Sequence, residues 1–178
     1  IADQIEHRKE SWSDFSDGVE RFIIGLSKKL ILANSFAPIA DYAFGHISEL
    51  SGVSAWIGAL CYTFQIYFDF SGYSDMAIGL GKMFGFQFLE NFRYPYLSVS
   101  VSEFWRRWHI SLGSWFRDYV YIPLGGSRVK TKVRLIGNLF VVWTLTGIWH
   151  GANWTFLLWG LWYFLLLTFE KMTGIPQN

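Results

Sequence analysis

The longest apolar stretch, residues 135–169, limits most strongly what this chain can fold into. As one straight α-helix these 35 residues would be about 50 Å long, whereas the hydrocarbon core of a bilayer is about 30 Å thick. A single membrane span is therefore excluded. The natural break is at Gly151, Ala152 and Asn153, because glycine commonly ends a helix and asparagine commonly caps the next one.

The composition predicts a membrane protein. Of the 178 residues, 52% are hydrophobic, 20% are aromatic and only 16% are charged, whereas about 25% of an ordinary soluble domain is charged. We therefore predict an all-α fold, a multi-pass transmembrane helical bundle with a broken helix at residues 151–153. The chain starts at Ile1 and shows no signal-peptide pattern, so we expect it to be a piece of a longer protein.

The first ninety residues show a less regular apolar pattern. We expect residues 1–20, which are polar and of mixed charge, to form a loop outside the membrane. Two lysines and a proline interrupt residues 22–44, which predicts a partial or interfacial helix. Residues 53–68 are a better membrane span, and they run into a polar stretch at 69–75. Such a stretch is tolerated within an apolar segment where protein or water satisfies its polar groups.

Basic residues are concentrated in residues 93–134, which carry a net charge of +6 while the rest of the chain sums to −5. By the positive-inside rule we expect this segment to face the cytoplasm. Within it, residues 101–119 form an amphipathic, tryptophan-rich pattern typical of a helix in the membrane interface, with Ser100 and Glu103 as a capping box. An RNA-binding patch is the competing interpretation. The apolar flanks disfavour it, so we expect no nucleic-acid partner.

His150 directly precedes the predicted break and is the strongest candidate for chemistry. An ionisable side chain inside an apolar segment indicates function by default, although a structural histidine bonded to a neighbouring helix is the alternative. Sixteen helical residues separate it from Arg134, which places it about 24 Å deeper. Gly147 would let another helix approach closely. A neutral imidazole there could take the proton from a hydroxyl that attacks an activated acyl group.

Other polar residues have functional and structural interpretations of similar weight. His109 is either a second catalytic residue or an interfacial histidine that packs on tryptophan. Arg106 and Arg107 bind either a phosphate of a thioester carrier or lipid head groups. Asp69 binds an acceptor, or bonds helix ends and interior waters. No metal site is expected, because no ligand spacing is present. The predicted substrate-binding residues are Arg106, Arg107, Trp105, Trp149, Asn153, Asp69 and Tyr73.

Three stretches of the sequence resemble the membrane-bound O-acyltransferase (MBOAT) family, in its bacterial branch of alginate O-acetyltransferase-like proteins. They are QIYFDFSGYSDMAIGLG (65–81), ENFRYPYLSVSVSEFWRRWHISLGSWFRDYVYIPLGGSR (90–128) and GIWHGANWTFLLWGLW (147–162). The resemblance implies that His150 is the family's catalytic histidine and that His109 is its second polar position. It also implies a ring of tilted helices around a tunnel, of which this chain is a fragment.

The resemblance further implies an activity in the bacterial inner membrane. An acetyl-like group would pass from a cytoplasmic thioester donor, acetyl-CoA or acyl carrier protein, to a polysaccharide hydroxyl or a periplasmic relay partner. The donor is a substrate, and no bound cofactor is expected. One alternative is a D-alanyl transferase that acts on teichoic acid. Another, from a different class, is a non-catalytic membrane channel or scaffold module.

Overall fold

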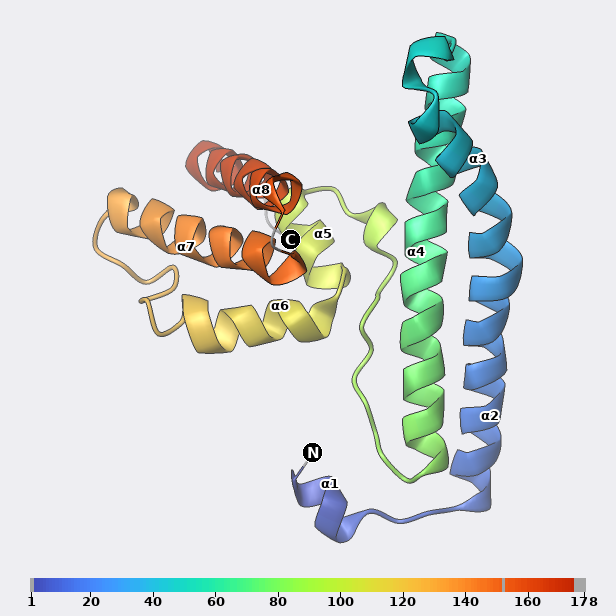
Figure 1. The fold of residues 1–178 in the computed structure, drawn as a ribbon. Helices are drawn as coiled ribbons and strands as arrows, with labels where there is room; N and C mark the ends of the chain where they lie inside the picture. Colours follow the sequence, from blue (N-terminus) through green and yellow to red (C-terminus); the bar gives the residue numbers. More distant parts are fainter. Residues whose placement is uncertain (1, 152, 175–178) are drawn as a thin grey trace. The chain divides into compact units, whose positions relative to one another are not determined.

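The computed structural model describes residues 2–151 and 153–174, and all the regular secondary structure in these ranges is helical (Figure 1). The chain divides into two compact units, Ile1–Glu90 and Asn91–Asn178. The helices of the first unit are α1 (Ala2–His7), α2 (Trp12–Ser27), the π-helix η1 (Lys28–Ala33), α3 (Asn34–Gly45), the 3₁₀-helix η2 (Ile47–Glu49) and α4 (Gly52–Met83). Those of the second are the 3₁₀-helix η3 (Pro95–Leu97), α5 (Val101–Arg107), α6 (Ile110–Phe116), the π-helix η4 (Arg117–Tyr121), α7 (Lys132–His150) and α8 (Trp154–Thr173).

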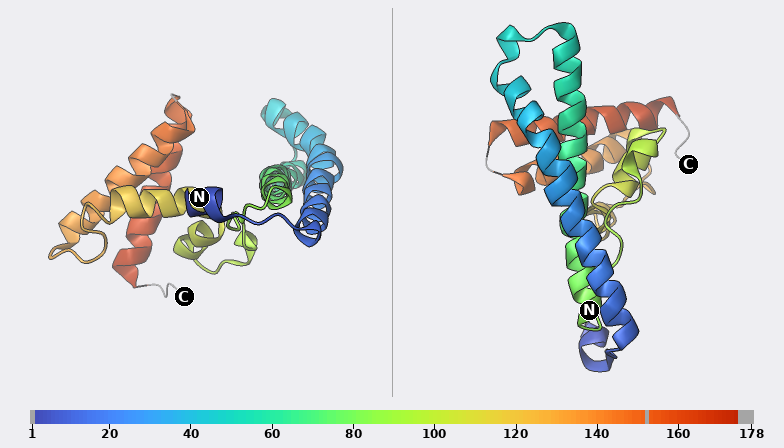
Figure 2. Two further views of the ribbon diagram at one scale, coloured as in Figure 1. Left: turned by 90° about the horizontal axis from the view of Figure 1, so that it is seen from below. Right: turned by 90° about the vertical axis from the view of Figure 1, so that its right-hand side faces the viewer.

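The predicted all-α class is confirmed for the described residues. Within them, one helical stretch is both long and apolar enough to cross a membrane, Trp12–Gly45, which has 34 residues and a mean hydropathy of 1.3 in its apolar 18-residue window. It comprises α2, η1 and α3, which follow one another without a break along α4 (Figures 1 and 2).

Two predictions for the first unit are wrong. Residues 2–20 are not one loop, because they contain α1 and the start of α2, and Ser11 caps α2 by accepting a hydrogen bond from Asp14 N. Residues 22–44 are not a partial helix, because α2, η1 and α3 continue through them, with a change from α-helix to π-helix at Lys28. Lys28 and Lys29 form ion pairs with carboxylates of α4 and therefore remain within a continuous helix. The interfacial position stays a prediction.

The polar stretch at 69–75 lies within α4, which runs through it without a break. Asp75 is buried and accepts hydrogen bonds from Arg21 Nε at 2.8 Å and from Lys28 Nζ at 2.5 Å. Arg21 also donates to Glu90 Oε1 at 2.9 Å. The Asp75 carboxylate is thus satisfied by protein, as expected for a polar group within an apolar helix, whereas the buried Oγ of Ser71 has no hydrogen-bond partner among the described residues.

Glycines allow the antiparallel helices α2 and α4 to approach closely. Gly18 faces Gly79 and Gly25 faces Gly72, so that a Cβ on any of the four would lie 2.6–2.7 Å from the backbone oxygen of the opposite glycine. Only residues without a Cβ permit this spacing, which in turn brings Asp75 within reach of its cationic partners. The glycine pairs and the ion pairs therefore stabilise the same helix contact.

In the second unit, α7 and α8 form a hairpin with the predicted break. α7 ends at His150, Gly151 has a φ of 152°, and Asn153 Oδ1 accepts a hydrogen bond from Thr155 N at 3.1 Å as the cap of α8. Ala152 lies outside the described residues. Gly147 contacts α8 closely, because a Cβ on it would lie 2.7 Å from the backbone oxygen of Phe156. The predicted role of Gly147 is confirmed.

The amphipathic helix predicted at 101–119 is divided in two. Ser100 Oγ caps α5 by accepting from Glu103 N at 3.1 Å, as predicted. The helix then stops, because Trp108 is extended and His109 is left-handed, with a φ of 47°. A new helix, α6, begins at Ile110. This interruption at His109 organises the candidate site.

Candidate active site around His109

His109 holds a backbone conformation that non-glycine residues rarely adopt, and it does so as the N-terminal flanking residue of α6. Its own side chain does not cap that helix. Asn91 takes over this role from the start of the second unit: its backbone oxygen accepts from Ile110 N at 3.0 Å, and its side-chain oxygen accepts from Ser111 N at 3.1 Å. Asn91 thus satisfies the first amides of α6.

The same asparagine contacts the imidazole. His109 Nδ1 lies 3.2 Å from Asn91 Oδ1 and 3.4 Å from Ser111 Oγ, and Ser111 Oγ also donates to Asn91 Oδ1 at 2.9 Å. Burial, together with the electrostatic effect of His150, lowers the pKa of His109 from 6.5 to about 4. With this lowered pKa the imidazole of His109 is neutral at physiological pH.

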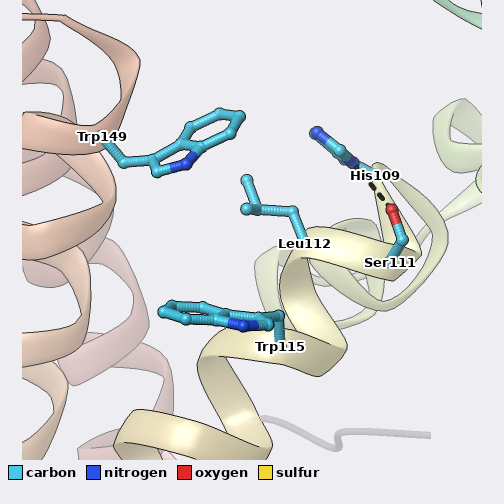
Figure 3. A pocket seen from close by; sticks show the side chains of 5 residues that line it. All are labelled: His109, Ser111, Leu112, Trp115 and Trp149. Atoms are coloured by element: carbon cyan, nitrogen blue, oxygen red, sulfur yellow. Dashed lines mark hydrogen bonds between the residues drawn. The ribbon is translucent and has the colours of Figure 1, made fainter.

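An open pocket of about 320 Å³ lies beside this histidine (Figure 3). α7 contributes Trp149, while the opposite wall consists of His109 and the first turns of α6. The indole ring of Trp149 faces the imidazole of His109, with 6.1 Å between the ring centroids. The lining residues are His109, Ser111, Leu112, Trp115 and Trp149.

His150 follows Trp149 at the end of α7 and is exposed on this unit. Its ring is held among aromatic side chains, with centroids 5.0 Å from Trp149, 6.0 Å from Phe156 and 4.8 Å from Trp159. His150 does not line the pocket itself, but Trp149 does, and His150 acts electrostatically on His109. The second unit therefore brings the two predicted catalytic histidines to one place.

The remaining predicted residues of the second unit have structural contacts. Trp105 packs edge-on against the rings of Trp143 and Trp159, at centroid distances of 4.9 and 5.6 Å. Arg107 forms an ion pair with Glu103 at 2.5 Å, which occupies part of its guanidinium, whereas Arg106 is exposed. A substrate role for these arginines, for Trp105 and for Asn153 stays a prediction.

Asp69 and Tyr73 belong to the first unit. Asp69 forms an ion pair with Lys29, and Tyr73 is 62% exposed. The ion pair is a third role for Asp69, beside acceptor binding and bonding to helix ends. Among the described residues no three His, Cys, Asp or Glu side chains are grouped as metal ligands.

Sequence reasoning missed the residues that complete the pocket. Asn91 lies 18 residues before His109, and only the loop that leads to α5 brings them together. Leu112 and Trp115 were assigned to the apolar face of one long helix, where they would have contacted lipid. The break at His109 instead directs them toward the pocket. Ser111 and Asn91 carried no periodic signal.

The chain is similar to known acyltransferases. The model of the membrane-bound O-acyltransferase family matches residues 4–174. The chain is 54% identical over 175 residues to the probable alginate O-acetylase AlgI of Azotobacter vinelandii, covering 98% of this chain and 35% of that protein. It is 42% identical to the peptidoglycan O-acetyltransferase of Helicobacter pylori, covering 96% of this chain and 35% of that protein.

A more distant relative is the teichoic acid D-alanyltransferase of Bacillus subtilis, 33% identical over 189 residues, covering 96% of this chain and 47% of that protein. The chain thus spans about a third of the length of the O-acetylases that it matches. The family match extends over almost all of both compact units. The chain belongs to the membrane-bound O-acyltransferase family.

Proposed function

We propose that the protein is a membrane O-acyltransferase that moves an acetyl-like group from a thioester donor to a polysaccharide hydroxyl or to a periplasmic relay partner. The observation that carries this proposal is the pocket beside His109 and Trp149, with His150 adjacent to it. Acyl transfer needs a base, a positioned thioester and donors for the developing oxyanion. The two histidines and the pocket supply the first two of these needs.

In the proposed reaction, His150 accepts the proton of the acceptor hydroxyl as its oxygen attacks the thioester carbon. The new C–O bond forms, the C–S bond breaks, and the departing sulfur takes a proton from the imidazolium as the free thiol. The His109 side of the pocket holds the donor end, because the apolar Leu112 and Trp115 can bury an acyl thioester there. No bound cofactor is needed, since the thioester is a substrate.

The similarities favour acetyl transfer over D-alanyl transfer. Identity is 51–54% to five alginate O-acetylases, 42% to a peptidoglycan O-acetyltransferase and 33% to a D-alanyltransferase. We propose that acetyl-CoA or an acyl carrier protein is the donor and that an exopolysaccharide is the final acceptor.

We further propose a multi-pass position in the bacterial inner membrane, with residues 93–134 on the cytoplasmic side. α7 and α8 have 19 and 20 residues, which corresponds to about 30 Å of helix and to the thickness of the hydrocarbon core. α8 also exposes an apolar stripe that is suited to lipid. Its members are Leu158, Trp162, Leu165 and Phe169, each 56–63% exposed.

The test is His150→Ala in the intact protein, expressed in a strain that lacks the native gene, with polymer O-acetyl content as the measurement. His46→Ala is the matched control, because His46 ends α3 of the first unit and stacks on Tyr42. We expect normal membrane levels of both variants, with acetylation lost only in His150→Ala. Unchanged acetylation in that variant would favour the non-catalytic channel or scaffold module.

A further inference from the structure

We propose that Asn91 is a positioning residue that fixes His109 in the tautomer with hydrogen on Nδ1, so that Nε2 carries the lone pair used at the pocket. The proposal rests on the proposed function for the use of His109, but the tautomer can be measured without any activity. Three observations lead to it: the orientation of the Asn91 amide, the partner of Nδ1, and the cap of α6.

The orientation of the Asn91 amide follows from Ser111. The backbone N–H of Ser111 can only donate, and it lies 3.1 Å from the Asn91 side-chain atom assigned as oxygen. If the amide were flipped, an NH₂ group would face this N–H, and the N–H of Ser111 would lose its acceptor. The atom that faces α6 is therefore the carbonyl oxygen.

The protonation of His109 follows from that oxygen. Nδ1 lies 3.2 Å from Asn91 Oδ1, and a carbonyl oxygen can only accept. If Nδ1 carried no hydrogen, its lone pair would point at a lone pair of Asn91 Oδ1, which is repulsive. The hydrogen is therefore on Nδ1. The ring is neutral near pH 7, hence the lone pair is on Nε2. Figure 3 shows this far end of the ring turned toward Trp149, across the pocket from α6.

Asn91 also holds the backbone that carries the ring. Its two oxygens accept from Ile110 N and Ser111 N, which stabilises the left-handed conformation of His109. Such a conformation is unfavourable for a residue with a Cβ. One residue, through its backbone and side-chain oxygens, thus sets the backbone, the tautomer and the orientation of the imidazole. Removal of the outer hydrogen-bond partner of a metal-bound histidine typically costs about 10- to 100-fold in affinity or activity, and we expect a loss on this scale for His109.

The experiment compares Asn91→Leu and Asn91→Asp with the matched control Asn138→Leu. Asn138 is a buried asparagine of the same unit, and it bonds Gly126 O instead of the site. The intact protein is labelled with ¹⁵N-histidine in detergent, and the signal of His109 is assigned by its loss in His109→Gln. Polymer O-acetyl content is measured in parallel in cells and normalised to membrane level.

We expect the wild type and Asn138→Leu to show the Nδ1-protonated tautomer. Asn91→Leu should give a mixed or Nε2-protonated signal, with acetylation reduced about 10- to 100-fold. Asn91→Asp keeps the acceptor but adds a negative charge, so the pKa of His109 should rise by about 1–3 units. His150 is a titratable group that acts electrostatically on His109, and all these variants retain it.

An Nε2-protonated ring in the wild type, or an unchanged signal in Asn91→Leu, would overturn the inference. Equal losses of acetylation in Asn91→Leu and Asn138→Leu would also overturn it, since both would then act through stability alone. The proposed function fails separately, if His150→Ala retains acetylation. Loss of acetylation in that variant beside an unchanged tautomer in Asn91→Leu would remove the role of Asn91 and leave the acyltransferase.

Discussion

Replacement of Gly79 by alanine tests the close contact of α2 and α4. The new Cβ would lie 2.6 Å from Gly18 O and 2.7 Å from Phe22 N, both of which are backbone atoms of a rigid helix. Ordinary contact begins at 3.4 Å, so the two helices must separate locally by about 0.8 Å. Overpacking of this kind typically costs about 1–3 kcal/mol.

A second glycine, whose Cβ would meet no neighbouring atom, serves as the control that separates this strain from helix propensity. Gly137 lies within α7, and nothing lies within 4 Å of a Cβ placed on it. Glycine to alanine within a helix gains up to about 1 kcal/mol of helix propensity at either position. The difference between the two variants therefore measures the strain alone, and Gly79→Ala should be about 1–3 kcal/mol less stable than Gly137→Ala.

Thermal unfolding of the purified intact protein in detergent provides the comparison, with tryptophan fluorescence as the signal. Gly137→Ala should melt at or slightly above the temperature of the wild type, and Gly79→Ala should melt below it. Gly18→Ala should resemble Gly79→Ala, and the double variant should cost less than the sum because both changes strain one contact. Equal melting temperatures for Gly79→Ala and Gly137→Ala would refute the close packing of the two helices.

Three further changes test other parts of the structure. Asp75→Asn leaves Arg21 and Lys28 without their buried carboxylate and should destabilise the protein by about 1–3 kcal/mol. The cost is less than for a fully buried pair, because both cations are about a third exposed. A denaturation curve that matches the wild type would contradict this prediction. Glu170→Gln should cost about 1–3 kcal/mol, since this buried carboxylate accepts from Val101 N and Ser102 N at the start of α5, and the melting temperature measures it. Because burial lowers the pKa of His109 from 6.5 to about 4, unfolding takes up a proton between these values, so stability should fall as the pH drops from 6.5 to 4. His109→Gln should flatten that dependence, and a wild-type melting temperature independent of pH over this range would contradict the shift.

The helical class, the break at Gly151 and the cap at Asn153 could be predicted from sequence because each depends on local properties. The apolar stretch 135–169 is longer than one membrane span, Gly151 adopts the φ that ends α7, and Asn153 caps α8. The candidate histidine His150 was also visible, since an ionisable residue stands out in an apolar run. Contacts between neighbouring residues determine all of these features.

The errors arose where distant residues determine the structure. The lysine pair at 28–29 looked like an interruption, but α4 places a carboxylate beside each of these lysines. The break at His109 could not be read from the periodic apolar pattern, because Asn91 stabilises it from 18 residues away. The pocket exists only because of that break.

The central claim is that acyl transfer takes place in the pocket beside His109 and Trp149. The most direct measurement is an experimental structure of the intact protein with S-acetonyl-pantetheine. This thioether mimics the arm shared by coenzyme A and acyl carrier proteins, and acyl transfer cannot cleave it. Our account predicts the acetonyl group of this analogue against Trp149 and Leu112, within reach of both imidazoles. An analogue bound elsewhere, with this pocket filled by side chains or lipid, would contradict it.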